Sequence, residues 1–543
     1  MNTKSRRWRF WAWAAVAGVV SAAVFLAVAE IVALVAARDG SPILAVGSFV
    51  IDIVPQPFKE FAIATFGEYD KIALLAGLGL AVVIAAAIAG VLQFLKPPLG
   101  VLALVLAGGL SLAAIVTRAG ATAFSWLPPV AGTIAGCIVL AMLIARLRRW
   151  ATDATDTAAE PAAPAEPSEA PKLLESPTVH PKTPAVASVD RRSFFRFTAI
   201  AGLSAVAVGV GARIASAATS SVDAVRRALN LPTPRSTVTI PAGAELDIPG
   251  ITPLITPNAD FYRVDTALTV PSIDPATWRL VIDGMVDERI ELSFDDLVAM
   301  GVDEYAITLT CVSNEVGGNL VGNATWMGVP VRDVLALAGP QSGADMVLSQ
   351  SVDGYTASTP LASLTDDGLD AILAIAMNGE PLPLEHGFPV RMVVPGLYGY
   401  VSATKWLTEL KVTTFADDEA YWTPRGYSAE APIKFSSRID TPRIDKEIAA
   451  GMTPIAGVAW AQTVGIERVE VSIDDGDWQP ATLSTPINDN TWVQWVVEWD
   501  ATPGVHYVAC RAINKNGDLQ IAERVPIAPN GSSGWERALI RVV

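Results

Sequence analysis

A single cysteine stands at the end of an apolar run and opens a loop rich in glycine and asparagine. The segment is TLTCVSNEVGGNLVGNATW, residues 308–326, and the cysteine is Cys311. A thiolate at the end of a strand, facing a pliable loop, can coordinate a soft metal. A lone cysteine, however, is more often a buried apolar residue. The residues alone therefore leave two interpretations of Cys311 open, a metal ligand and a core side chain.

The segment closely resembles the molybdenum-binding region of the sulfite oxidase family. In that family the cysteine after the strand is the only protein ligand of the metal, so the resemblance implies that Cys311 binds molybdenum. It extends over about residues 253–524, with the motifs in the family's order. The matching motifs are Thr256-Pro257-Asn258, Asp260-Phe261-Tyr262-Arg263, Trp326-x-Gly328-Val329-Pro330, His386-Gly387-Phe388-Pro389-Val390-Arg391, Val394-Pro395-Gly396, Lys405-Trp406-Leu407, Ile433-Lys434 and Ser437-Arg438-Ile439-Asp440.

The resemblance implies a molybdenum-molybdopterin cofactor, a flat, anionic pterin dithiolene with a terminal phosphate. Such a group requires cationic and amide donors at its ends and a close approach of the backbone at its face. Without the family context, Arg391 fits a surface ion pair and His386 a satisfied core histidine, and phosphate binding by Ser402 and Thr404 stays open. The residues implied to bind the cofactor are Asn258, Tyr262, Arg263, Asn314, His386, Arg391, Ser402, Thr404 and Lys405.

The resemblance also implies oxygen-atom transfer as the reaction, on a small-molecule substrate. Catalytic roles are expected for Cys311, Arg263 and Tyr398, and Tyr398 and Trp422 are expected to line the substrate pocket. We expect no attached cytochrome domain, so electrons must pass to a separate partner, a quinone or a cytochrome.

Two departures from the family concern the substrate. The family's Cys-Ala-Gly-Asn followed by arginines is Cys311-Val312-Ser313-Asn314-Glu315 here, and its Arg-Asn-His segment is Arg263-Val264-Asp265. Sulfite binding relies on a cluster of arginines, and bidentate guanidinium groups are hard to replace. Because Glu315 near the metal would repel a small oxyanion, we expect sulfite to be a poor substrate.

Two other functions fit the same residues. One keeps the cofactor and reduces a sulfoxide or an N-oxide with electrons drawn from the membrane. The other is a non-catalytic, membrane-anchored scaffold that has retained the fold. The presence of Cys311 favours an enzyme, because a scaffold would usually lose the metal-binding cysteine.

Composition places part of the chain in a membrane and excludes some partners. Of 543 residues, 51% are hydrophobic and 17% charged, and the mean hydropathy is +0.39. Soluble proteins have about 25% charged residues.

The net charge of −16 argues against nucleic acid as a partner, because binding nucleic acid requires basic patches. The three cysteines are too few and too far apart for a disulfide framework. None of the three histidines lies in an apolar segment, so no haem is expected.

Residues 1–150 are expected to form a transmembrane block of four helices. The apolar stretches are about Trp11–Ala37, Ile72–Leu95, Pro98–Thr117 and Leu127–Ala145. Each is near the roughly 20 residues that cross a bilayer. Basic residues before the first stretch and after the fourth place both ends of the block in the cytoplasm. The segment Ser41–Asp70 is too polar to cross and is expected along the outer surface.

Residues 151–190 are rich in Ala, Pro and Glu and are expected to be a cytoplasmic linker, because they have too few large apolar residues to fold. Residues 191–218 begin with paired arginines and continue as a modestly apolar run. This pattern resembles a twin-arginine export signal placed internally, and a fifth transmembrane helix is the alternative. Both predict a cell-membrane protein, multi-pass, with its catalytic domain extracytoplasmic.

From residue 231 onward, short apolar runs separated by Gly, Pro and Asp predict strands mixed with short helices. Ser293–Met300 starts with a serine cap and Val331–Gly339 ends on glycine, so both are predicted helices. With the resemblance, residues 231–445 are expected to be an α+β molybdopterin-binding oxidoreductase domain. Residues 446–543 are expected to be an all-β immunoglobulin-like sandwich that serves as a dimerisation domain, with a homodimer as the expected assembly.

Overall fold

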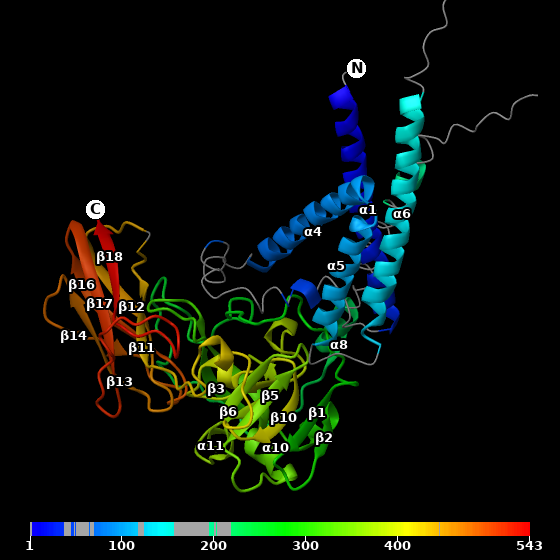
Figure 1. Cartoon of the computed structure of the whole chain (residues 1–543). Coiled ribbons are helices and arrows are strands. Elements are labelled where there is room, and N and C mark those ends of the chain that lie inside the picture. Colours follow the sequence, from blue (N-terminus) through cyan, green and yellow to red (C-terminus); the bar gives the residue numbers. More distant parts are fainter. Residues whose placement is uncertain are drawn as a thin grey trace, which may run out of the picture. The chain divides into compact units, whose positions relative to one another are not determined.

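The computed structural model describes residues 3–36, 45–47, 49, 65, 70–117, 124–156, 195–199, 202, 219–444 and 446–543. The chain divides into two compact units, Met1–Ala217 and Ala218–Val543, which are traced in Figure 1. Most of Ser41–Asp70, of the expected linker and of residues 191–218 lies outside the described residues, so the predictions for these segments stay predictions.

The first unit contains the four expected apolar helices. Each includes a stretch long and apolar enough to cross a membrane, which confirms the prediction at the level of length and composition. The last helix continues past Ala145 into the start of the expected linker, because the Arg, Leu, Trp and Ala residues after that position tolerate helix well. The helices are α1 (Thr3–Ala36), α4 (Asp70–Leu95), α5 (Leu99–Val116) and α6 (Leu127–Asp156).

Small residues allow α1 and α4 to pack with their backbones in contact. A Cβ added at Gly18 would collide with the carbonyl oxygen of Ala86, and one at Gly90 would collide with that of Ala14. Such approaches are typical of helices that associate within a membrane. At the ends of α4 and α6, the Arg148 guanidinium donates to the Phe94 carbonyl oxygen at 2.9 and 2.6 Å. The four-helix block is therefore internally packed.

Two five-stranded sheets form the first half of the second unit. One has the strand order β2-β1-β10-β5-β6, and the other has β3-β4-β7-β8 with β9 beside β7. All neighbours are antiparallel except β1 and β10. The strands are β1 (Arg279–Gly284), β2 (Ile290–Ser293), β3 (Asp303–Thr310), β4 (Val321–Pro330), β5 (Met346–Ser351), β6 (Thr356–Pro360), β7 (Ile372–Met377), β8 (Glu380–Pro381), β9 (Arg391–Val393) and β10 (Leu407–Thr413).

Short helices connect these strands, and both predicted ones are confirmed. In the first, the Ser293 hydroxyl accepts from the Asp296 backbone and the Asp296 carboxylate accepts from Ser293, which is a capping box. The second ends at Gly339 in the left-handed conformation. The helices are α8 (Thr219–Ala228), α9 (Phe294–Ala299), α10 (Val331–Ala338), α11 (Leu361–Thr365), η3 (Leu384–His386), α12 (Gly399–Ser402) and η4 (Thr423–Arg425). Helix α8 lies before residue 231, where the domain was expected to start. Its Val222 nevertheless packs against the apolar core that contains Trp326 and Ile372.

Two four-stranded antiparallel sheets form the rest of the chain, with the orders β11-β12-β16-β15 and β14-β13-β17-β18. They share one apolar core, to which Trp495 contributes from the first sheet and Cys510 from the second. The expected boundary between residues 445 and 446 lies between β11 and β12, although these strands pair. The strands are β11 (Ser436–Thr441), β12 (Gly451–Trp460), β13 (Ile466–Ile473), β14 (Gln479–Pro480), β15 (Thr482–Leu483), β16 (Val493–Ala501), β17 (Gly504–Asn514) and β18 (Glu536–Val542).

Candidate functional site

Cys311 follows directly after β3, as the sequence predicts, and its side chain is buried with 8% of the residue exposed. Burial raises the pKa of the Cys311 thiol, while the Ser313 backbone N–H, 3.4 Å from the sulfur, and the Lys405 ammonium act in the opposite direction. A bound cation would favour the thiolate further. The charge of Lys405 thus acts in the direction that favours a thiolate at Cys311, although burial is the larger effect.

Residues 311–320, here called the cysteine loop, close on themselves between β3 and β4. The Cys311 N–H donates to the Leu320 carbonyl at 2.9 Å, and the Asn314 N–H donates to the Cys311 carbonyl at 3.0 Å. The Asn314 side-chain oxygen accepts from the Leu320 N–H at 2.8 Å. Asn314, predicted to bind the cofactor, therefore fixes the loop's shape through its amide.

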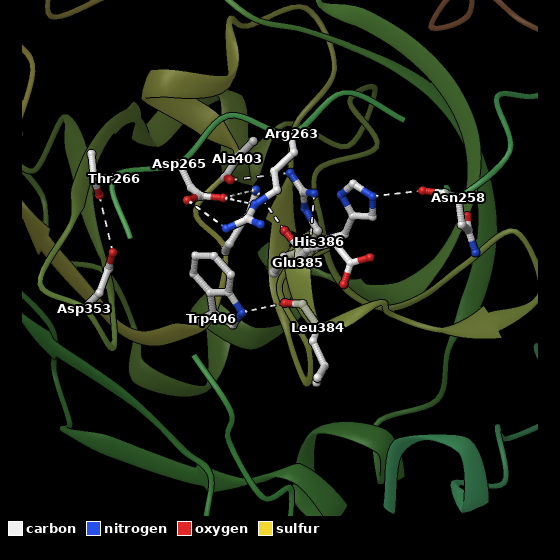
Figure 2. Close-up of polar contacts among 12 residues, drawn as sticks. Asn258, Arg263, Asp265, Thr266, Asp353, Leu384, Glu385, His386, Ala403 and Trp406 are labelled. Atoms are coloured by element: carbon white, nitrogen blue, oxygen red, sulfur yellow. Dashed lines mark hydrogen bonds and ion pairs between the residues drawn. The ribbon is translucent and has the colours of Figure 1, made fainter. Parts of the chain in front are cut away.

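His386 and Arg391 lie together, at the end of η3 and the start of β9. His386 Nε2 faces the Asn258 carbonyl oxygen at 3.1 Å, and Figure 2 shows this contact. Arg391 donates to the His386 carbonyl at 3.1 Å and lies 5.1 Å from the centre of the Trp326 ring. Burial lowers the pKa of Arg391 to about 10. Burial, together with the charges of Lys405 and Arg391, lowers the pKa of His386 to about 3, so its imidazole is neutral.

Lys405 and Arg263 meet at a single buried carboxylate, that of Asp265. The Lys405 ammonium is 3.1 Å and the Arg263 Nε is 2.9 Å from the same Asp265 oxygen. Figure 2 shows Arg263 beside Asp265. The Asp265 side chain is 5% exposed, whereas that of Arg263 is 38% exposed. Lys405 also donates to the Glu385 carbonyl at 3.0 Å. Burial lowers the pKa of Lys405 to about 8, although Asp265 opposes this.

The charge that counters the cations here is Asp265, not Glu315. The Glu315 side chain is exposed, so the expected repulsion of an oxyanion by Glu315 stays a prediction. The loop turns outward after Asn314, so the residue one position later faces solvent. Sequence comparison did flag Asp265 as a departure. Its burial between two cations was not foreseen, because Lys405 is 140 positions away along the chain.

The aromatic candidates divide into two groups. Tyr262 stacks on Phe261 at 5.2 Å, and burial together with the negative charge of Cys311 raises its pKa. Burial raises the pKa of Tyr398 to about 12, with a smaller contribution from Cys311. Both are thus buried phenols electrostatically coupled to the cysteine. Trp422 belongs instead to a half-buried cluster, 5.3 Å from the Tyr421 ring.

The smaller polar candidates mostly have protein partners. The Ser402 hydroxyl donates to the carbonyls of Leu397 and Tyr398, at 3.1 and 3.0 Å. The Thr404 hydroxyl is 2.7 Å from the Ser349 hydroxyl. The Asn258 side-chain oxygen accepts from Asn378 at 2.8 Å. Each of these three residues therefore stabilises the fold through hydrogen bonds within the protein. That they also bind the cofactor stays a prediction.

Several buried polar atoms near these residues have no hydrogen-bond partner within the described part of the chain. They include Thr310 Oγ1, next to Cys311, and also Ser351 Oγ, His386 Nδ1 and Arg391 Nε. Burying a polar atom unpaired costs roughly 1–3 kcal/mol, so this set suits a polar ligand. A Cβ at Gly387 would lie 3.0 Å from Arg391 and 3.1 Å from Lys405. A neutral imidazole, two buried cations and a small residue between them fit a flat anionic cofactor such as molybdopterin.

Comparison with known proteins identifies this region. Residues 267–422 match the family model "Oxidoreductase molybdopterin binding domain". Human mitochondrial sulfite oxidase is 32% identical over 321 residues, which cover 50% of this chain and 58% of the relative. The mouse enzyme is 31% identical over 340 residues, covering 53% and 62%. The chain thus matches about three fifths of the length of these relatives.

A solved structure, the sulfane dehydrogenase SoxCD from Paracoccus pantotrophus, aligns with 57% of this chain and 90% of its own, with a TM-score of 0.48 and 22% identity. Cys311, His386, Arg391 and Lys405 all lie inside the matched domain, and Asn258 to Asp265 lie just before it. The domain match and the sulfite oxidase relatives agree with the motifs. The chain therefore contains an oxidoreductase molybdopterin-binding domain, and over about half of its length it is similar to sulfite oxidases.

Proposed function

We propose that this protein is a molybdenum-cofactor-dependent oxidoreductase that transfers oxygen atoms to or from a small-molecule substrate. The observation that carries the proposal is the buried Cys311 thiol at the end of β3, electrostatically coupled to Lys405 and accompanied by buried unpartnered donors. The alternative of a non-catalytic scaffold gives no reason to keep buried polar atoms without partners beside the thiol, because such atoms cost stability.

The chain's own residues divide the work of such a site. Cys311 would hold the metal, and Arg391, Lys405 and His386 would bind the pterin and its phosphate. The bound group supplies the redox change and the oxygen atom exchanged with the substrate. Arg263, whose side chain is partly exposed, would contact the substrate. Tyr398, whose pKa of about 12 keeps it protonated, can donate a hydrogen bond to a substrate oxygen.

The charges at the site favour a neutral substrate, such as a sulfoxide or an N-oxide. Asp265 contacts both Arg263 and Lys405, so its negative charge offsets part of theirs and would repel a small anionic substrate. A small dianion such as sulfite requires several guanidinium contacts to replace its water. A neutral oxide requires one donor for its oxygen and an apolar surface for its body.

The cofactor assignment predicts that the purified full chain contains molybdenum and pterin in equal amounts, close to one of each per chain. Elemental analysis by mass spectrometry and fluorescence of the oxidised pterin measure the two independently. The proposal would be refuted if protein from a cofactor-producing host contained neither molybdenum nor pterin although circular dichroism showed it to be folded.

We further propose that the protein is anchored in the cell membrane as a multi-pass protein with residues 231–543 outside the cytoplasm. The arginines after the fourth helix's apolar stretch, at 146, 148 and 149, support a cytoplasmic linker, and the paired Arg191 and Arg192 support export of the C-terminal half. Electrons would then pass to a quinone or a cytochrome. The two C-terminal sheets with their common core would serve as the immunoglobulin-like dimerisation domain.

This topology predicts opposite labelling of two engineered cysteines in intact cells. Asp477→Cys, at an exposed position between β13 and β14, should react with a membrane-impermeant maleimide, and Ala163→Cys in the linker should react only after permeabilisation. Permeabilised cells are the control for both sites. Reaction of Ala163→Cys but not Asp477→Cys in intact cells would invert the orientation.

A further inference from the structure

The cysteine loop is held from outside by side chains of the two C-terminal sheets. Within the loop, the carbonyl oxygens of Asn314 and Gly318 are not used by the contacts that close it. Instead the Gly318 carbonyl accepts from Arg438 Nη1 at 3.0 Å, and the Asn314 carbonyl accepts from the Ser532 hydroxyl at 2.6 Å. Both donors belong to the C-terminal part of the chain, on β11 and just before β18.

Arg438 is itself fixed in place by two further contacts. Its Nε donates to the Asp440 carboxylate at 2.7 Å, and its Nη2 donates to the Thr252 hydroxyl at 2.8 Å. Its side chain is 10% exposed and that of Asp440 is 6% exposed. A buried guanidinium with three oriented donors has little freedom to move, so the oxygen it binds on Gly318 is held at a fixed place.

A third side chain, that of Glu536, packs against the cysteine loop at Gly317. The Glu536 carboxylate accepts from the Ile439 N–H at 2.6 Å, which turns it toward Gly317. A Cβ on Gly317 would lie 2.7 Å from Glu536 Oε1, so either the Glu536 side chain or the loop would have to shift. Gly317 also has φ +81°, which glycine adopts without strain. Glycine at position 317 therefore lets the loop lie against Glu536 without displacing its hydrogen-bonded carboxyl group.

We propose that Arg438, Ser532 and Glu536, here called the loop clamp, are positioning residues that set where the Cys311 sulfur lies. The C-terminal sheets thereby take part in the reaction site without touching the reacting atoms. The inference rests on the proposed function, because the position of the sulfur matters for catalysis only if Cys311 holds the metal. Support of this kind behind a metal ligand changes affinity or activity by about 10–100-fold in known metal sites.

Two matched pairs of variants test the clamp. Gly317→Ala introduces the collision with Glu536, whereas Gly379→Ala imposes the same left-handed strain, at φ +78°, where nothing lies within 4 Å. Ser532→Ala removes the hydrogen bond to the loop, whereas Ser533→Ala removes an equivalent one, at 2.9 Å, to the Glu523 carbonyl outside it.

The first measurement needs no cofactor. Each full-length variant is produced in a host that lacks the pterin cofactor, and alkylation of Cys311 by iodoacetamide is followed by mass spectrometry. Local opening of the loop exposes the thiol, so Gly317→Ala and Ser532→Ala should label Cys311 faster, the former by about tenfold. Gly379→Ala and Ser533→Ala should match the wild type. Cys510, buried in the C-terminal core, reports global unfolding and should stay unlabelled throughout.

The second measurement uses the cofactor-loaded full chain. Gly317→Ala and Ser532→Ala should lower kcat by about tenfold and leave KM nearly unchanged, because the substrate contacts are intact. Labelling of Cys311 at the wild-type rate in both variants would overturn the clamp, whatever the metal content. Faster labelling of both variants, in a protein whose wild type takes up no molybdenum, would leave the clamp in place and defeat the proposed function instead. Labelling of Cys510 in Gly317→Ala would mean that this variant unfolds globally. In that case the rate of Cys311 labelling in Ser532→Ala alone decides whether the clamp exists.

Discussion

Replacing Cys311 with serine is expected to abolish turnover of the full chain while its fold persists. A serine hydroxyl fills nearly the same volume at this buried position, but it does not ionise near neutral pH and is a poor ligand for a soft metal. Even the loss of a group that supports a metal ligand costs up to about 100-fold in activity, so loss of the ligand itself should cost at least that. Steady-state kinetics measures the loss of turnover, and circular dichroism of the same protein measures whether the fold persists.

Cys510→Ser is the matched control for this substitution. Cys510 is likewise buried on a strand, with the Ser437 hydroxyl 3.3 Å from its sulfur, but it lies in the core shared by the C-terminal sheets. Its replacement should leave turnover within about threefold of the wild type, because it changes packing alone. Full turnover in Cys311→Ser, with the metal still bound, would remove the cysteine from the mechanism.

Asp265→Asn is expected to improve the use of sulfite far more than the use of a neutral sulfoxide. In the wild type, the Asp265 carboxylate engages Lys405 and Arg263 at 3.1 and 2.9 Å. Asparagine removes its charge and frees both cations to face an anion. One charge-assisted hydrogen bond is worth about 1.5–3 kcal/mol, so KM for sulfite should fall by about 10–100-fold. The wild type should oxidise sulfite only at high concentrations.

The kinetics are best measured below pH 7, because burial lowers the pKa of Lys405 to about 8 and loss of Asp265 lowers this pKa further. Asp353→Asn is the matched control, since Asp353 accepts hydrogen bonds from Thr266 and the Tyr355 backbone. Molybdenum content is measured for both variants, because Lys405 is a proposed cofactor ligand. Saturable sulfite oxidation at micromolar concentrations by the wild type, unaltered in Asp265→Asn, would show that Asp265 does not govern selectivity.

Local features of the chain were predictable from the sequence because short-range rules decide them. The strand before Cys311 and the loop after it follow from an apolar run that ends in glycine and asparagine. The capping box at Ser293 and the left-handed end at Gly339 likewise depend on residues only a few positions apart. The four apolar helices follow from length and hydropathy alone.

Features that depend on distant residues were not predictable. Whether an acidic residue is exposed, as Glu315 is, or buried between two cations, as Asp265 is, depends on which segments meet in the fold. The pairing of β11 with β12 across the expected domain boundary, which brings Arg438 to the cysteine loop, is also a long-range contact. Ser402 and Thr404 were expected to bind the cofactor, but the sequence does not reveal which protein groups already bind their hydroxyls.

X-ray absorption at the molybdenum edge tests most directly the claim that the Cys311 sulfur is bound to the metal. The full-length wild type and Cys311→Ser are compared after metal loading, with Cys510→Ser as the reference. We predict that Cys311→Ser alone loses one sulfur neighbour from the metal and gains a lighter atom in its place. An identical number of sulfur neighbours in all three proteins would contradict this claim, because the metal would then be held without Cys311.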